Sequence, residues 1–223
     1  MKHREKWEGA FWSVHQCGEW LLRLAVAHLL WIGGTLLGGV VLGVFPATAA
    51  VHEVLGGQGS GGNRDDRGLA AAFWYAYRRY FWRSQLLGYA LLLSGVVLWG
   101  DLIFFLGLGT KWSLVCAALL AGISLLHTAI CCHAFALLVR LDRGFWAGIR
   151  QSFWAVAAFP LHAMVTVGGV FLCVGIMLVW PALPILLGAS ALVWWMAVRT
   201  VRLLEKCERK ATTQQLRGET YAV

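Results

Sequence analysis

The stretch Phe73-Trp74-Tyr75-Ala76-Tyr77-Arg78-Arg79-Tyr80-Phe81-Trp82 is the fullest of three copies of one aromatic pattern. The other two copies are Phe11-Trp12 with Trp20, and Phe145-Trp146 with Phe153-Trp154. In each copy the second Trp follows the first by eight residues, so both indoles fall near one face of a helix. A long apolar run follows each copy directly. The shared spacing therefore indicates that one structural unit has been duplicated.

Each copy predicts an amphipathic helix that lies at a membrane surface. Aromatic rings favour the headgroup zone of a bilayer, and Arg side chains reach anionic lipid headgroups. The residues that we expect to anchor these helices to lipid are Trp74, Arg78, Arg79, Trp82, Trp146, Arg150 and Trp154.

The composition is that of an integral membrane protein. Of 223 residues, 59% are hydrophobic and only 13% are charged, and several apolar stretches exceed the ~20 residues that a helix needs to cross a bilayer. The net charge of +8 comes from basic residues that flank the apolar runs. We therefore expect anionic membrane lipids as partners and no nucleic acid. We interpret the six Cys as reduced, small apolar residues.

The apolar runs predict an all-α polytopic membrane protein made of a single integral membrane domain, 1–223. Three units cover residues 7–63, 66–140 and 142–206, each with a surface helix and a helical hairpin, and 207–223 form a cytoplasmic tail. The predicted spans are 21–45, 86–108, 112–139, 155–180 and 185–201.

The first hairpin has a short, broken return leg, which gives five full spans and one half-leg. The leg runs from Pro46 to Leu55 and as a helix covers only ~15 Å, about half of the hydrocarbon layer. A glycine-rich stretch, 56–63, follows it. Irregular backbone at membrane depth must be shielded, so we expect the other helices to enclose this leg. We expect Gly34, Gly38, Gly39 and Gly43 to serve close helix packing.

The distribution of Lys and Arg predicts the orientation. If the half-leg returns the chain to its starting side, every basic residue except Lys111 lies on one side of the membrane. The positive-inside rule then places both termini in the cytoplasm. A plain five-span arrangement would instead leave the N-terminal basic residues outside.

One stretch carries a resemblance to a known family. His28-Leu-Leu-Trp31 is followed by Gly43-Val-Phe-Pro46-Ala47-Thr48-Ala49-Ala50 and then by the aromatic pattern of 73–82. This order resembles the YesL-like family of bacterial membrane proteins, although Phe45 stands where the family usually has Gly and His28 where Asn is frequent. The resemblance covers roughly the first 100 residues. It implies a structural motif at Pro46, Ala47, Thr48 and Ala50, and a bacterial cytoplasmic-membrane protein whose molecular activity is unsettled.

Genes of that family often lie beside genes for carbohydrate uptake. The resemblance therefore implies an accessory component of carbohydrate uptake, with a sugar ABC-type permease as its partner. The broken leg keeps open a second interpretation, a small-solute transporter or channel. A membrane enzyme that acts on a lipid-linked substrate is a third. Hydrolase, kinase and nucleotide-binding motifs are absent from the sequence, so we expect no enzyme, no catalytic residue and no cofactor.

Polar residues within apolar runs are the candidates for a functional site. We name His52, Glu53, His28 and His162 as the substrate-binding candidates, with His133 expected at the depth of His28 and His162. Such a group could bind a metal or relay protons. No ligand pair occurs at i, i+4 and no carboxylate accompanies the histidines, so we favour neutral, hydrogen-bonded histidines and predict no metal site. The half-leg is either a functional site or a packing motif, with about equal support.

Overall fold

The protein is helical throughout the part that its structure describes. This computed structural model describes residues 2–56, 68–142, 145–180 and 182–220. Within these ranges the helices are α1 (Lys2–Leu37), α2 (Val44–Gly56), α3 (Leu69–Gly107), α4 (Lys111–Leu141), α5 (Phe145–Ala158), α6 (Pro160–Val179) and α7 (Ala182–Thr220). The glycine-rich stretch lies outside the described residues, apart from Gly56.

Five segments are long and apolar enough to cross a membrane. They are Gly18–Leu37, Leu69–Gly107, Lys111–Leu141, Pro160–Val179 and Leu186–Cys207. The predicted fold class, an all-α polytopic membrane protein, is therefore confirmed. Helix α2 is not among these segments, because its 13 residues reach only ~20 Å.

The half-leg α2 is enclosed by other helices, as predicted. It packs against α1, α3, α4 and α7. Ala47, Ala49, Ala50 and Val51 have no exposed surface, and they form one apolar cluster with Ala27 of α1, Tyr80 of α3, Val139 of α4 and Val193 of α7. A short helix with small side chains can be surrounded in this way because neighbouring backbones approach it closely.

The first span ends earlier than the predicted boundary at residue 45. Helix α1 stops at Leu37, a turn occupies 38–43, and α2 begins at Val44. Gly39 has a φ of 63°, which glycine adopts without steric strain. A Cβ atom on Gly43 would lie 2.2 Å from the carbonyl oxygen of Thr35. Gly38 and Gly43 thus allow close backbone packing, as expected, but they do so within the turn and against the end of α1, whereas Gly39 only forms the turn.

The surface helix is separate from its span only in the third unit. Helices α1 and α3 each continue from the aromatic pattern into the apolar run without a break. In the third unit α5 ends at Ala158 and α6 starts with Pro160, so the predicted span 155–180 is too long at its start. The pyrrolidine ring disfavours helical backbone at the preceding residue, and Phe159 has a φ of −138°.

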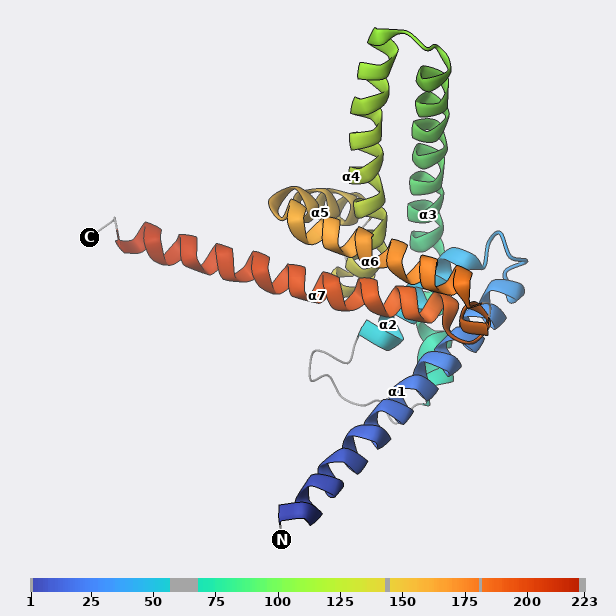
Figure 1. Cartoon of the computed structure of the whole chain (residues 1–223), viewed down its shortest axis with the longest axis vertical. Helices are drawn as coiled ribbons and strands as arrows, with labels where there is room; N and C mark the ends of the chain where they lie inside the picture. The colour runs from blue at the N-terminus through green and yellow to red at the C-terminus, as the bar shows by residue number, and fades with distance from the viewer. Residues whose placement is uncertain (1, 57–67, 143–144, 181, 221–223) are drawn as a thin grey trace.

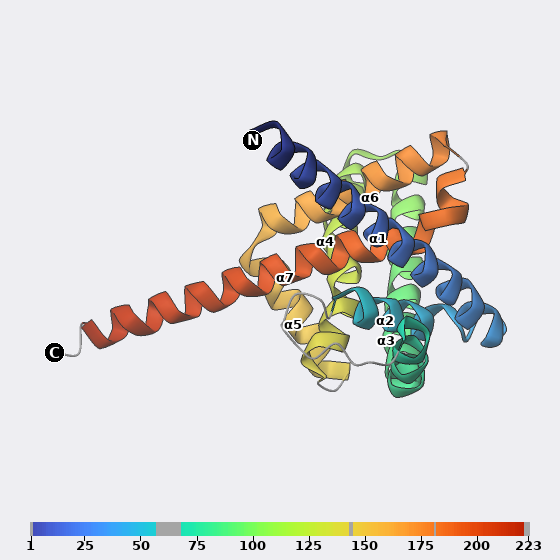
Figure 2. The ribbon, with the colours of Figure 1, turned by 90° about the horizontal axis from the view of Figure 1, so that it is seen from below.

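The helices do not form a simple parallel bundle. Helices α3 and α4 stand side by side as a hairpin, while α6 and α7 cross it steeply (Figure 1). Seen from below, α1 lies across α7, and the C-terminal part of α7 extends away from the other helices (Figure 2). The half of the hairpin near residues 108–110 stands clear of the remaining helices (Figure 1).

Candidate functional site

The motif residues join α2 to α1 through one hydroxyl group. The indole Nε1 of Trp31 donates to Thr48 Oγ1 at 3.1 Å, and Thr48 Oγ1 donates to the carbonyl oxygen of Val44 at 2.7 Å. Pro46 lies in the first turn of α2, where a helix leaves its backbone N–H groups unpaired in any case. Pro46 therefore starts the helix and does not weaken it.

Side chains of α3 donate hydrogen bonds to the end of α1 and to the turn between α1 and α2. Tyr77 Oη donates to the carbonyl oxygen of Gly34 at 3.1 Å, and Tyr89 Oη donates to that of Val41 at 3.0 Å. Gln85 Nε2 donates to the carbonyl oxygen of Leu42. Helix α3 thus adds to the hydrogen bonds within the turn, such as that from the N–H of Val40 to the carbonyl oxygen of Thr35, and so satisfies backbone groups at membrane depth.

His52 and His133 each keep a buried nitrogen without a hydrogen-bond partner. The exposed fraction is 3% for His52 and 0% for His133. His133 Nδ1 lies 2.7 Å from Thr200 Oγ1, whose hydroxyl group donates to the carbonyl oxygen of Met196. His133 Nδ1 is therefore the donor, and Nε2 is an acceptor. Within the described residues, neither His133 Nε2 nor His52 Nδ1 has a partner.

The surroundings of His52 disfavour its charged form. Burial lowers the pKa of His52 to about 3, and repulsion from His133, when that residue is protonated, and from Arg140 adds to this decrease. Protonation would place a charge among apolar side chains and beside another cation, and both effects are unfavourable. His52 is therefore neutral at physiological pH.

His162 and His28 use their ring nitrogens to hold helices together. His162 Nε2 donates to the carbonyl oxygen of Arg199 at 2.8 Å, and Arg199 Nη2 lies 3.3 Å from His162 Nδ1. His28 Nδ1 accepts from the backbone N–H of Ala189 at 3.3 Å. These contacts favour a packing role for both residues over the predicted substrate-binding role.

The histidines do not form one group. The rings of His133 and His162 lie 6.5 Å apart between centroids. His28 contacts α7 ten residues before Arg199, which is ~15 Å along a helix. In the described part of the chain, no three His, Cys, Asp or Glu side chains converge as metal ligands.

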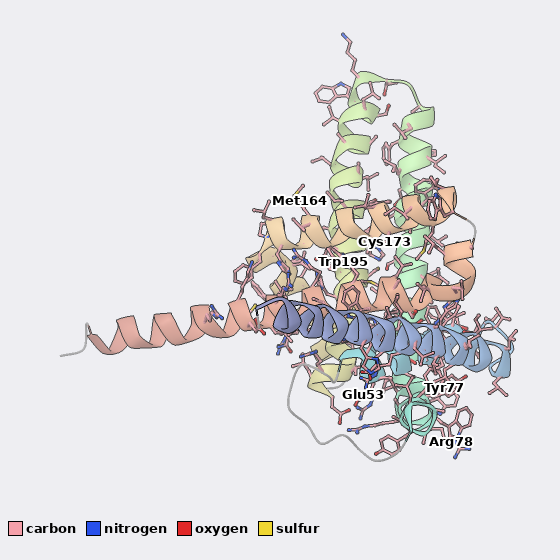
Figure 3. All side chains as sticks on the ribbon, turned by 60° about the horizontal axis from the view of Figure 1, so that its bottom comes forward. Glu53, Tyr77, Arg78, Met164, Cys173 and Trp195 are labelled. Atoms are coloured by element: carbon pink, nitrogen blue, oxygen red, sulfur yellow. The ribbon has the colours of Figure 1, made fainter. Side chains whose placement is uncertain are left out.

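Glu53 is only partly buried, unlike its neighbour His52. Burial raises the pKa of Glu53, with a further increase from Asp142 and a decrease from Arg79 and Arg140. Figure 3 places Glu53 at the end of the molecule that holds Arg78. Glu53 thus belongs to a group of charged residues at the end of α2, where Arg140 Nη2 also donates to the carbonyl oxygen of Gly56 at 2.8 Å.

The predicted lipid anchors differ in their contacts. The indoles of Trp74, Trp82, Trp146 and Trp154 are exposed, and so is Arg150. The guanidinium of Arg78 lies over the Trp74 ring at 4.9 Å from its centroid. Arg79 donates to Asp142 at 2.5 Å, and Arg83 donates to the same carboxylate at 2.9 Å. Arg79 therefore joins α3 to the C-terminal end of α4, a contact that the sequence analysis missed.

An apolar groove of about 460 Å³ lies along the α3–α4 hairpin. Its lining includes Phe45, Gly88, Trp99, His127 and Phe135. His127 Nε2 lies 2.9 Å from Ser94 Oγ. The volume falls within the range of small-molecule sites, but the lining has few polar groups of the kind that bind a sugar.

Comparisons with known proteins find a matching family and relatives for part of this chain. Residues 24–102 match the family described as "Protein of unknown function, DUF624". The resemblance to the YesL-like family is confirmed. The chain is 39% identical over 95 residues to the uncharacterized protein YteU of Bacillus subtilis (strain 168), which is 43% of this chain and 42% of that protein. It is 33% identical over 88 residues to the uncharacterized protein YesL of the same organism, with 40% and 41% covered.

These matches cover about two fifths of each YesL-like relative. No solved structure matches the chain. The family segment begins at Leu24 and ends at Leu102, so it contains all of α2, the turn before it and most of α3. The hydrogen bonds from Trp31, Tyr77, Gln85 and Tyr89 therefore all lie within the segment that the family defines.

Proposed function

We propose that this YesL-like protein is an accessory component of a bacterial cytoplasmic membrane and that it assists carbohydrate uptake by packing against a transport protein. In this proposal it is not an enzyme, and both termini are cytoplasmic. The family resemblance supports the link to uptake. The partner is a sugar ABC-type permease, with anionic lipids around the surface helices.

One observation carries the proposal. The part of the α3–α4 hairpin nearest residues 108–110 stands clear of the other helices (Figure 1), and its side chains are largely exposed and apolar. The segment from Tyr89 to Gly107 is ~28 Å long, which matches the ~30 Å hydrocarbon layer. A spanning hairpin of this kind offers a surface to another membrane protein.

The test combines co-purification with uptake. The tagged full-length chain is expressed in a bacterium together with a sugar ABC-type permease, and the membranes are extracted in mild detergent. We expect the permease to co-purify and uptake of its radiolabelled sugar to fall when the gene for this chain is deleted. Normal uptake and no co-purification across the permeases of the host would contradict the proposal.

A transporter in its own right is the second candidate. Buried His52 and His133, with their unpartnered nitrogens, favour it, because such groups in membrane proteins often serve a solute or proton path. Purified protein in liposomes that moves a sugar or protons without any partner would establish this function. His52→Gln should then abolish the flux while the protein stays folded.

A further inference from the structure

Asp101 is an exposed carboxylate on the membrane-spanning hairpin. It is the only acidic residue in α3, and α4 has none. Within the described part of the chain, Asp101 has no hydrogen bond or ion pair, and its side chain is exposed. Ionisable residues in spanning helices normally face a protein interior or a water-filled cavity, where they find partners. Asp101 has neither within this chain.

The apolar residues that follow Asp101 favour a position within the hydrocarbon layer. Six residues, or ~9 Å, separate it from the end of α3. Beyond it, Ile103, Phe104 and Leu106 are 54%, 62% and 54% exposed. Such an apolar segment belongs in lipid, so the membrane extends past Asp101 toward the tip. Water outside the membrane therefore does not account for this carboxylate.

The neighbours of Asp101 define one side of the hairpin. In a helix, Val97, Phe104 and Ser94 lie on the same side of α3 as Asp101, whereas Leu92, Val96 and Trp99 of the apolar groove lie on another. Val97 is 53% and Phe104 62% exposed, whereas the hydroxyl group of Ser94 lies 2.9 Å from His127 Nε2 of α4. The free part of this surface is therefore Val97–Asp101–Phe104, in which two exposed apolar side chains flank one negative charge.

We propose that this surface binds a transmembrane helix of a partner protein, and that the partner presents a Lys or Arg at the depth of Asp101. Opposite charges in a low-dielectric layer attract strongly, and the apolar residues around Asp101 supply the packing that membrane helices need. This inference rests on the proposed function and names the chemistry of the partner. Its test uses a defined helix and does not depend on sugar uptake.

The experiment measures binding of model helices to the full-length protein in nanodiscs. The probes are fluorescent Leu/Ala transmembrane peptides: one has a single Lys at the depth of Asp101, a second has Leu there, and a third has the Lys near its other end. Energy transfer to the labelled protein reports the association. We expect the first peptide to bind about tenfold more tightly than the other two.

Variants at Asp101 test the charge pair directly. Asp101→Asn should reduce binding of the Lys peptide to that of the Leu peptide, and Asp101→Glu should retain it. Asp101→Lys should prefer a peptide with Glu in place of Lys. Circular dichroism and size-exclusion chromatography check folding. If a variant does not fold, the comparison among the three peptides on the wild-type protein decides.

Two results would overturn the inference. One is equal binding of all three peptides to the wild-type protein. The other is Asp101-dependent energy transfer between two labelled copies of this chain, which would identify a second copy as the occupant. If a permease co-purifies with the Asp101→Asn variant, this surface is not its binding site, but the proposed function stands. If the Lys peptide binds but no permease associates with the protein, the binding surface stands and the proposed function is contradicted.

Discussion

Thr48 makes two contacts with one hydroxyl group, and both stabilise the start of α2. Thr48→Val keeps the shape and removes the acceptor for Trp31 Nε1. A polar group left without its partner in a partly buried site costs about 1–3 kcal/mol. We expect a lower unfolding temperature in detergent, with Thr48→Ser close to wild type. The control is a double-mutant cycle with Trp31→Phe. If Thr48→Val lowers the stability of the Trp31→Phe variant as much as it lowers that of the wild type, the two residues do not interact.

His52 should make stability depend on pH. Its pKa is about 3 in the folded protein and 6.5 in an unfolded chain, so the unfolded chain binds the proton first as the pH falls. The free energy of unfolding should therefore decrease from pH 6.5 toward 3, by at most about 1.4 kcal/mol per pH unit. His52→Gln should remove this contribution.

Thermal unfolding at pH 7 and at pH 5 provides the measurement. The matched control is His15→Gln, because the side chain of His15 is exposed on α1, where it pairs with Glu19 one turn further along. An equal loss in wild type and His52→Gln would mean that other groups determine the pH dependence.

The position of Glu53 weakens the prediction that Glu53 binds a substrate, because this residue lies among charged side chains at the end of α2.

At the scale of elements, the ring of Phe45 in α2 packs directly against Gly88 of α3. A Cβ atom on Gly88 would lie 2.3 Å from the ring of Phe45, so Gly88→Ala forces the ring or the backbone to move. Overpacking of this kind costs about 1–3 kcal/mol. Phe45→Leu in the same chain should restore part of the loss.

Gly100 offers a matched control in the same helix. Nothing lies within 4 Å of a Cβ atom placed there, and Ala favours helix by about 1 kcal/mol over Gly. We therefore expect Gly100→Ala to keep or raise the unfolding temperature, while Gly88→Ala lowers it. Equal effects of the two variants would show that Phe45 does not fix the distance between α2 and α3.

Hydropathy and proline positions predict most of these elements. Apolar runs locate the five spans, and the shortness of 46–55 correctly predicts an enclosed half-leg, which accounts for the burial of His52. The turn at 38–43 could not be predicted from hydropathy, because the sequence stays apolar through it. Backbone groups in and beside the turn bond to one another, and two further hydrogen bonds come from Gln85 and Tyr89, more than 40 residues away. No local pattern specifies such contacts.

At the scale of the whole molecule, one part of the structure is closely packed and another part has few neighbours. Helix α2, its neighbours α1, α3, α4 and α7, and their buried histidines form the packed part. The far half of the α3–α4 hairpin stands outside it (Figure 1). Lipid can cover the exposed apolar side chains of this hairpin, but it offers no partner to the carboxylate of Asp101. Asp101 is therefore the feature of this half that the proposed partner helix would explain.

The orientation of the whole chain gives the last prediction. Figure 1 places the tip at residues 108–110 far from the N-terminus, the start of α3 and the end of α4. The single basic residue Lys111 lies at that tip, and the other basic residues lie elsewhere. Because basic residues stay in the cytoplasm, topology reporters at residues 1 and 223 should report the inside. A reporter inserted beside Lys111 should report the outside. A reporter within 57–67 serves as the internal control, because both arrangements of the first unit place it inside. An outside signal at residue 1 would mean that α2 does not return the chain to its starting side.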